Sequence, residues 1–168
     1  MLGHICALTN KDPNAVLVVA CGAGVTAGSF VPHPEVNDIT IVDIEPLVPE
    51  HVAPLFAFEN HDVVNSDKTT VIVDDGRHFI HTTKEKFDVI ITALPPPSTA
   101  QLNRYYTEEF FNEVNISMNP GGVFGFIVES SEDFIDKSLA EFLAGFQNTM
   151  GKAFTHTAIL PGYNACFL

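Results

Sequence analysis

Basic side chains are scarce in this sequence. Its 168 residues include eight lysines and arginines against 21 aspartates and glutamates, which gives a formal net charge of -13. Such a chain repels a phosphate backbone, so we expect no nucleic-acid partner. Cationic partners are attracted instead, although a surplus of acidic side chains also serves solubility alone.

Cysteines are few as well. Cys6, Cys21 and Cys166 are odd in number, far apart and free of any C-x-x-C pair. This pattern argues against a disulfide scaffold and a zinc knuckle, so we expect ordinary buried thiols. His78 and His81 have a spacing that can bind a metal, but no third ligand with a suitable spacing accompanies them. We therefore expect a solvated helix face at these histidines and no metal.

Long apolar runs are absent. No segment approaches the roughly 18 apolar residues that cross a bilayer. The N-terminal MLGHICALTNKDPN lacks the basic and apolar regions of a signal peptide. We therefore expect a cytoplasmic protein with no membrane segment in this chain. The hydrophobic fraction of 46% and the charged fraction of 17% are typical of a folded chain, and the length suits a single domain over residues 1–168.

Short apolar runs rich in β-branched residues recur along the chain. Each has the length of a buried strand and is continuously apolar. They cover residues 15–20, 38–44, 69–75, 87–94 and 122–128. Helix-compatible segments cover residues 24–31, 46–58, 76–82, 104–117 and 135–149. This alternation predicts an α/β fold with a doubly wound, mostly parallel sheet that is covered by helices on both faces.

The segment 104–117 is the clearest of the predicted helices. Tyr106, Phe110 and Val114 fall on one helical face, so we expect that face to be buried.

Just before the segment, Thr99 has no G-x-S-x-G motif around it, which argues against a hydrolase nucleophile. A turn or a helix cap is the expected role of this residue.

A glycine-rich turn, ACGAGVTAG, follows the first predicted strand. The spacing Gly22-x-Gly24-x-x-Ala27 lets the backbone turn tightly and approach a ligand, although both glycines also fit a plain turn. The second predicted strand contains Asp43 near its end, about 20 residues further on, where a carboxylate can accept both hydroxyls of a ribose. This combination favours a nucleotide-type ligand.

The third predicted strand ends in VIVDDGRHF, which places Asp74, Asp75 and Gly76 at the same sheet edge. An aspartate there can accept a hydrogen bond from the exocyclic amine of adenine. MNPGGVFGFIV is a turn and strand typical of methyltransferase-type sheets, and AFTHTAILPGYNACFL predicts a terminal antiparallel hairpin with its turn at Pro161-Gly162. Together these features favour an S-adenosylmethionine methyltransferase-like Rossmann fold over a dehydrogenase.

Several longer segments occur in a recognisable order: NAVLVVACGAGVTAGSFVPHPEVNDITIVDIEP, VIVDDGRHF…KEKFDVII, YYTEEFFNEVNISMNPGGV and ILPGYNACFL. In this combination the chain resembles the spermidine synthase (polyamine aminopropyltransferase) family over nearly its whole length. LPPPSTAQLNRYYTEEFF is most similar to the spermidine synthase-like domains that follow a membrane-spanning region in many bacteria. The family transfers an aminopropyl group from decarboxylated S-adenosylmethionine to an amine such as putrescine, and it releases methylthioadenosine.

This resemblance implies an adenosyl-ligand site at three strand ends and no metal. The ligand would be decarboxylated S-adenosylmethionine or S-adenosylmethionine. The glycine loop would pass its amino-acid-derived portion, the carboxylate of the second strand would hold the ribose, and the third strand end would hold the adenine. The residues implied are Gly22, Ala23, Gly24, Asp43, Ile44, Asp75 and Gly76.

Two departures from the family pattern concern the acceptor amine. The family places two aspartates, spaced D-x-x-D-P, after the fourth strand, and the matching positions here are Ala93 and Pro96. Neither side chain can take a proton from an attacking ammonium. Glu129 or Asp74 is left to supply a carboxylate to a rearranged site. We also expect the chain to lack the family's small N-terminal β domain, which helps to bind the amine and often joins subunits.

Three functions therefore stay open. The first is aminopropyl transfer to a cationic amine, the second is noncatalytic binding of an adenosyl ligand, and the third is methyl transfer from S-adenosylmethionine. A homodimer is compatible with all three.

Overall fold

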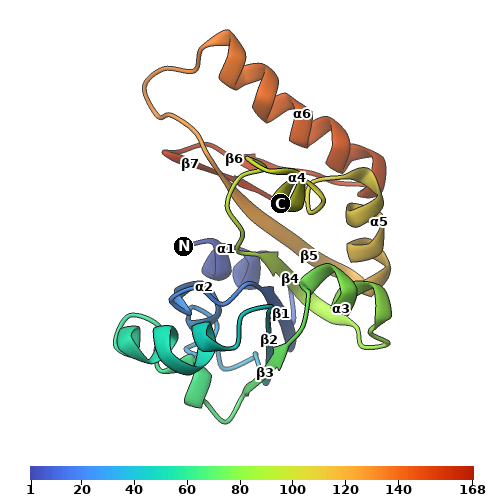
Figure 1. Cartoon of the computed structure of the whole chain (residues 1–168). Helices are drawn as coiled ribbons and strands as arrows, with labels where there is room; N and C mark the ends of the chain where they lie inside the picture. Colours follow the sequence, from blue (N-terminus) through green and yellow to red (C-terminus); the bar gives the residue numbers. More distant parts are fainter.

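One seven-stranded sheet organises the computed structural model, which describes residues 1–168. Its strands are β1 (Ala15–Val19), β2 (Asp38–Asp43), β3 (Thr69–Val73), β4 (Phe87–Thr92), β5 (Met118–Glu129), β6 (Ile159–Leu160) and β7 (Asn164–Phe167). The spatial order is β3-β2-β1-β4-β5-β7-β6 (Figure 1). The first five strands are parallel, and β7 runs antiparallel to both of its neighbours. The predicted fold class, including the terminal hairpin, is confirmed.

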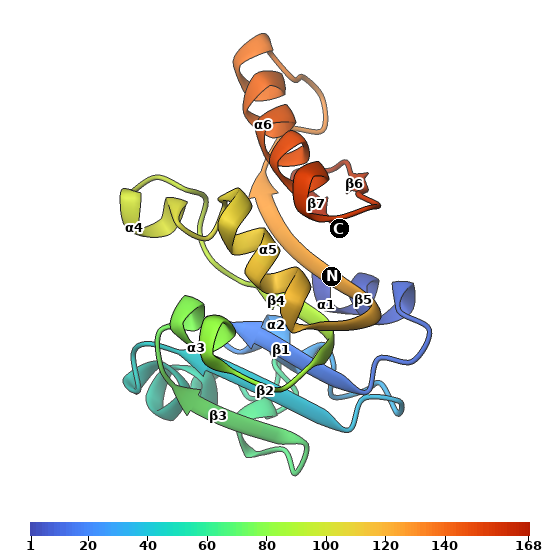
Figure 2. The same cartoon turned by 90° about the vertical axis from the view of Figure 1, so that its right-hand side faces the viewer.

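Helices cover both faces of this sheet. The α-helices are α1 (Leu2–Thr9), α2 (Val25–Gly28), α3 (Gly76–Thr82), α4 (Ala100–Asn103), α5 (Glu108–Ser117) and α6 (Lys137–Ala153). A π-helix, η1 (Val48–Val52), and two 3-10 helices, η2 (Ala53–Phe56) and η3 (Val63–Asn65), connect β2 to β3. Figure 1 shows α1 and α2 on one side of the sheet and α3 and α5 on the other, and in Figure 2 this second side faces the viewer.

Two separate cores result from the alternation of side chains along the strands. In β1, Leu17 and Val19 enter the core that contains the buried side chains of α3, α5 and α6. Val16 and Val18 enter the opposite core, which contains those of α1 and α2. Burial on both faces explains why the parallel strands are continuously apolar in sequence.

The helices differ from the prediction at several places. Residues 46–58 form η1 and η2 rather than one α-helix, and each of these begins with a proline at its first or second position, Pro49 and Pro54, where the missing N–H breaks a longer helix. Residues 104–107 lie outside any helix, because α5 begins at Glu108, where Thr107 caps it by accepting from the Phe110 amide at 3.3 Å. The helices α1, η3 and α4 were not predicted, and α2 is shorter than the predicted segment 24–31.

No helix combines the length and the apolar character that a membrane span requires. The three cysteines are free and buried, as expected.

The sheet reverses its strand order between β1 and β4. On one side of β1 lie β2 and β3, and on its other side lie β4 and β5. In open α/β sheets, ligands bind outside the carboxyl ends of the strands at such a reversal. The residues that follow β1 to β5 are therefore the place for a site.

Candidate functional site

The loop after β1 has the backbone of a ligand-approach turn. Ala20, Gly22 and Gly24 all have positive φ, at 73°, 52° and 77°. The Ala20 amide donates to the Val42 carbonyl of β2 at 2.9 Å, which ties the start of the loop to the sheet. Gly22 is exposed, and a Cβ built on it would meet nothing within 4 Å. The loop therefore presents bare backbone to open space, as a close ligand contact requires.

Asn60 is wholly buried beneath this loop. Its Nδ2 donates to the Ala23 carbonyl at 2.8 Å and to the Ala53 carbonyl at 2.7 Å. A Cβ on Gly24 would lie 2.8 Å from that nitrogen, and a Cβ on Gly28 would lie 2.0 Å from the carbonyl oxygen of Asn60. Both glycines are therefore required by packing, and Asn60 fixes the height of the loop above the sheet.

Asp43, the last residue of β2, lies beside the loop and is 9% exposed. Its Oδ2 accepts from the Cys21 amide at 2.7 Å, and its Oδ1 accepts from the Glu45 amide at 2.9 Å. A carboxylate has about four lone-pair positions, so each oxygen keeps one for a further donor. The two adjacent hydroxyls of a ribose can use both. Ile44 follows with an exposed side chain.

The Cys21 thiol lies in the same loop and is a weak nucleophile. Burial, with a smaller effect of the nearby Asp43, raises the pKa of Cys21 to about 11. The thiol is therefore protonated at neutral pH, and only the thiolate is a good nucleophile.

Asp75 caps α3 at the end of the third strand. Its Oδ1 accepts from the amides of Arg77 at 3.0 Å and His78 at 3.1 Å, and its Oδ2 pairs with Arg104. Burial on its own would raise the pKa of Asp75, but the hydrogen bonds from Arg104 and the two amides outweigh it and lower the pKa. A Cβ on Gly76 would lie 2.3 Å from the Val19 side chain, so α3 packs closely on β1. One lone pair of Asp75 is left for a ligand donor.

The two histidines of α3 point to different partners. His78 Nδ1 lies 2.8 Å from Asp74 Oδ2, and His81 Nδ1 lies 3.6 Å from Glu113 Oε1. Both imidazoles are mostly exposed, with 62% and 70% of the side chain accessible. They form the solvated helix face that their spacing suggested. Asp74 Oδ1 also accepts from the Asp75 amide at 2.7 Å.

Arg104 connects the loop after β4 to this strand end. Besides its pair with Asp75, its Nη2 donates to the Tyr105 hydroxyl at 3.1 Å, and its guanidinium lies 4.9 Å from the centre of the Tyr105 ring. Tyr105 and Tyr106 are both buried, so both belong to the core. The Tyr106 hydroxyl donates to the Pro95 carbonyl at 2.9 Å, which anchors the proline segment.

We predict that Arg104→Met raises the pKa of Asp75 and destabilises the fold by about 1 kcal/mol at pH 6, because a partly exposed ion pair is lost. The pKa of Asp75 is lowered on folding, so the contribution of this carboxylate is present above its unfolded pKa and is lost as pH falls through the folded value. A carbon-detected NMR titration should show the Asp75 midpoint moved to higher pH. Urea unfolding at pH 6 gives the stability difference.

The matched control is Lys137→Met, which removes a cation from the exposed Lys137–Glu141 pair at 3.7 Å. We expect almost no change in stability from it. An unchanged Asp75 midpoint in Arg104→Met would show that the guanidinium does not stabilise this carboxylate.

Ala93 and Pro96 line a hollow of about 240 Å³ at the carboxyl ends of β4 and β5, which we call the β4–β5 hollow. The Ala93 amide donates to the Val19 carbonyl at 2.9 Å, so the hollow adjoins the end of β1. Thr92 is 1% exposed, and its hydroxyl has no hydrogen-bond partner. The lining residues are Leu2, Thr26, Thr92, Ala93, Leu94, Pro96, Ile127, Glu129 and Asn164.

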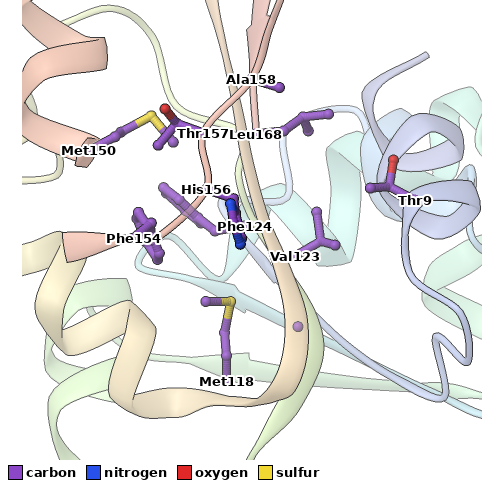
Figure 3. Close-up of a pocket in the computed structure, with 11 residues that line it drawn as sticks. Thr9, Met118, Val123, Phe124, Met150, Phe154, His156, Thr157, Ala158 and Leu168 are labelled. Atoms are coloured by element: carbon purple, nitrogen blue, oxygen red, sulfur yellow. The ribbon is translucent and has the colours of Figure 1, made fainter. Parts of the chain in front are cut away.

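A second hollow, of about 250 Å³, lies beside the first half of β5 (Figure 3). It is surrounded by Met118 and Phe124 of β5, by Met150 of α6 and by Phe154, which directly follows α6. His156 is the one titratable side chain in its lining. This apolar hollow is lined by the amino-terminal half of β5, so it lies away from the strand ends that carry Asp43 and Asp75.

Comparison with known proteins identifies the family. The model of the spermine/spermidine synthase domain matches residues 1–165. The chain belongs to the spermine/spermidine synthase family. A polyamine aminopropyltransferase of Sulfurisphaera tokodaii is 31% identical over 116 residues, which are 67% of this chain and 38% of that protein. The chain spans about half the length, or less, of the curated members of the family that it matches.

Solved structures agree on the fold. A spermidine synthase in complex with the transition-state analogue AdoDATO superimposes with a TM-score of 0.80 at 21% identity, covering 99% of this chain and 57% of that one. The human methyltransferase-like protein 13 in complex with SAH has a TM-score of 0.68 at 19% identity, covering 99% of this chain and 74% of that one. The spermine/spermidine synthase family member described here therefore shares its fold with both kinds of protein.

The predicted site residues lie at one edge of the sheet, after β1, β2 and β3. Three further residues at this edge were not predicted: Asn60 beneath the loop, Arg104 on Asp75, and Thr92 in the β4–β5 hollow. Asn60 and Arg104 act through partners 37 and 29 residues away. No local pattern signals such contacts. Thr92 could have been found, since it directly precedes the segment ALPPP.

Proposed function

We propose that this chain binds an adenosyl ligand and serves aminopropyl transfer, with an acceptor site that differs from the usual pair of aspartates. The ligand is decarboxylated S-adenosylmethionine, S-adenosylmethionine or methylthioadenosine. The observation that carries the proposal is the Asp43 carboxylate, which is held by two backbone amides and keeps one lone pair on each oxygen. That arrangement suits the two hydroxyls of a ribose.

Two neighbouring features support the same ligand. In the loop of Gly22, Ala23 and Gly24 both glycines have positive φ, and the Gly22 backbone is exposed near Asp43. Asp75 and Gly76 are placed at the adjoining strand end, with one acceptor position of Asp75 left for an adenine amine. The spermidine synthase that shares this fold was solved in complex with the transition-state analogue AdoDATO, which is consistent with this assignment.

The acceptor side is where the proposal departs from the family pattern. Ala93 and Pro96 occupy the positions of the two aspartates, and neither can take a proton. Glu129 is the carboxylate in the lining of the β4–β5 hollow. It is exposed, at the end of β5. We assign to it the attraction of the incoming ammonium and the removal of its proton, since an ammonium has no lone pair with which to attack.

A calorimetric titration with methylthioadenosine, S-adenosylmethionine and its decarboxylated form tests the binding. We expect saturable binding with one site per chain, and protection against heat unfolding that grows with ligand concentration. A second assay supplies decarboxylated S-adenosylmethionine and an amine and measures methylthioadenosine. No heat with any of the three ligands would refute the proposed function.

A second candidate is noncatalytic binding of the same ligand. The neutral side chains at Ala93 and Pro96 favour it. The two candidates differ in the second assay only: binding without release of methylthioadenosine, at high protein concentration and with several amines, would assign the chain to noncatalytic binding.

A further inference from the structure

The β4–β5 hollow has one charged side chain in its lining, Glu129. The next acid along the chain, Glu132, lines a different hollow and accepts from the Tyr163 amide at 3.3 Å. Asp74 is paired with His78 on α3. A ligand in the β4–β5 hollow thus meets a single negative charge.

The rest of the hollow is apolar or neutral. Leu94 and Ile127 are half-buried, and Leu2 is 4% exposed. The Thr92 hydroxyl, which is buried and has no partner, is the most deeply placed polar group. It can exchange a hydrogen bond with a neutral group, but it cannot balance a second positive charge.

We infer that the acceptor of the β4–β5 hollow is a small primary monoamine with an apolar body, rather than a diamine. This inference rests on the proposed function and names its acceptor class. The single ammonium of a monoamine pairs with Glu129, while its carbon chain lies against Leu94 and Ile127. The second ammonium of a diamine of the same length would lie in the apolar part of the hollow without a counter-charge, which is costly.

The reaction of such an acceptor is balanced without any further reagent. The bound ammonium first loses one proton to Glu129 or to water. Its nitrogen lone pair then forms a bond to the aminopropyl carbon next to sulfur, and the carbon–sulfur bond breaks with its electron pair going to sulfur. The products are a secondary ammonium and neutral methylthioadenosine, so the positive charge of the sulfonium is carried away by the new ammonium.

Two amines of equal chain length test the inference. Methylthioadenosine binding to the free chain is measured first, and n-butylamine and putrescine are then titrated into the chain saturated with methylthioadenosine. We expect n-butylamine to bind at least about five-fold more tightly than putrescine. Glu129→Gln should abolish the binding of n-butylamine, whereas Glu132→Gln should leave it unchanged. Ala93→Asp should reverse the order of the two amines.

The outcomes distinguish a failure of the proposed function from a failure of the acceptor class alone. Failure to bind methylthioadenosine overturns the proposed function and the acceptor class together. Binding of methylthioadenosine with equal or tighter binding of putrescine overturns the acceptor class alone, and so does an unchanged affinity for n-butylamine in Glu129→Gln. Circular dichroism of each variant establishes that it is folded.

Discussion

Gly28→Ala should destabilise the protein by about 3 kcal/mol, near the upper end for overpacking in a well-packed core. The added Cβ would lie 2.0 Å from the carbonyl oxygen of Asn60, 2.5 Å from its carbonyl carbon and 2.7 Å from its Cα. These are backbone atoms, so no rotamer change relieves the clash. Urea unfolding should show the loss, and the melting temperature should fall by roughly 6–12 °C for a chain of this size.

Ligand affinity should fall in the same variant. Asn60 cannot yield to the new Cβ without moving its Nδ2, which holds the Ala23 carbonyl of the glycine loop. The loop would move away from the position set by Asp43. A calorimetric titration of folded Gly28→Ala with methylthioadenosine should therefore give weaker binding than the unchanged chain.

Gly145→Ala is the matched control. This glycine is exposed in the middle of α6, and a Cβ on it would meet nothing within 4 Å. Alanine is the better helix former, so we expect a gain of roughly 0.5–1 kcal/mol. Similar stabilities for the two variants would contradict the role given to the contact between Gly28 and Asn60.

The parts of the site that follow from strand periodicity could be predicted from the sequence. Continuous apolar runs locate the strands, and the residues directly after each run meet at one sheet edge because the strands are parallel. This reasoning places Gly22, Asp43 and Asp75 together without any knowledge of their contacts. It also places Ala93 at the same edge, beside β1.

The supporting contacts could not be predicted in this way. Asn60 lies in an irregular connection, and its role depends on how that connection folds back under α2. Arg104 falls within a segment whose apolar pattern resembles one helix, while in the structure it is the C-cap of α4 and α5 begins only at Glu108. Each contact joins segments that are distant in sequence, so it depends on tertiary packing rather than on local preference.

The segment ALPPP shows both what can be predicted from the sequence and what cannot. Its prolines end β4, because each lacks an N–H and restricts the residue before it. The neutral character of Ala93 and Pro96 is visible in the sequence. That Glu129 lines the same hollow is not visible there, since it reaches the hollow from β5, 33 residues after Pro96 along the chain.

Asp43→Ala should have a large effect on both stability and binding. It removes the acceptor of the Cys21 and Glu45 amides at 2.7 Å and 2.9 Å. A buried N–H left without a partner costs about 1–3 kcal/mol, so we expect a loss of about 3 kcal/mol in the free energy of unfolding. Urea unfolding without ligand measures this part.

Binding of methylthioadenosine should weaken further, because both ribose hydroxyls would lose their acceptor. Each hydrogen bond to a charged group contributes about 1.5–3 kcal/mol, so the loss of even one corresponds to a loss of affinity of roughly 10- to 150-fold, and the loss of both to more. Calorimetry on the folded variant, at a temperature well below its melting point, separates this loss from the loss of stability.

Asp38→Ala provides the control within the same strand. Asp38 begins β2 at the opposite sheet edge and is exposed. Both variants change the net charge equally, so any effect of overall charge on a ligand is shared. Of these two aspartates, Asp43 alone contacts the glycine loop and adjoins the proposed ribose position, so Asp38→Ala should keep the affinity for methylthioadenosine. If both variants bound it equally well, the ribose could not be placed at the end of β2.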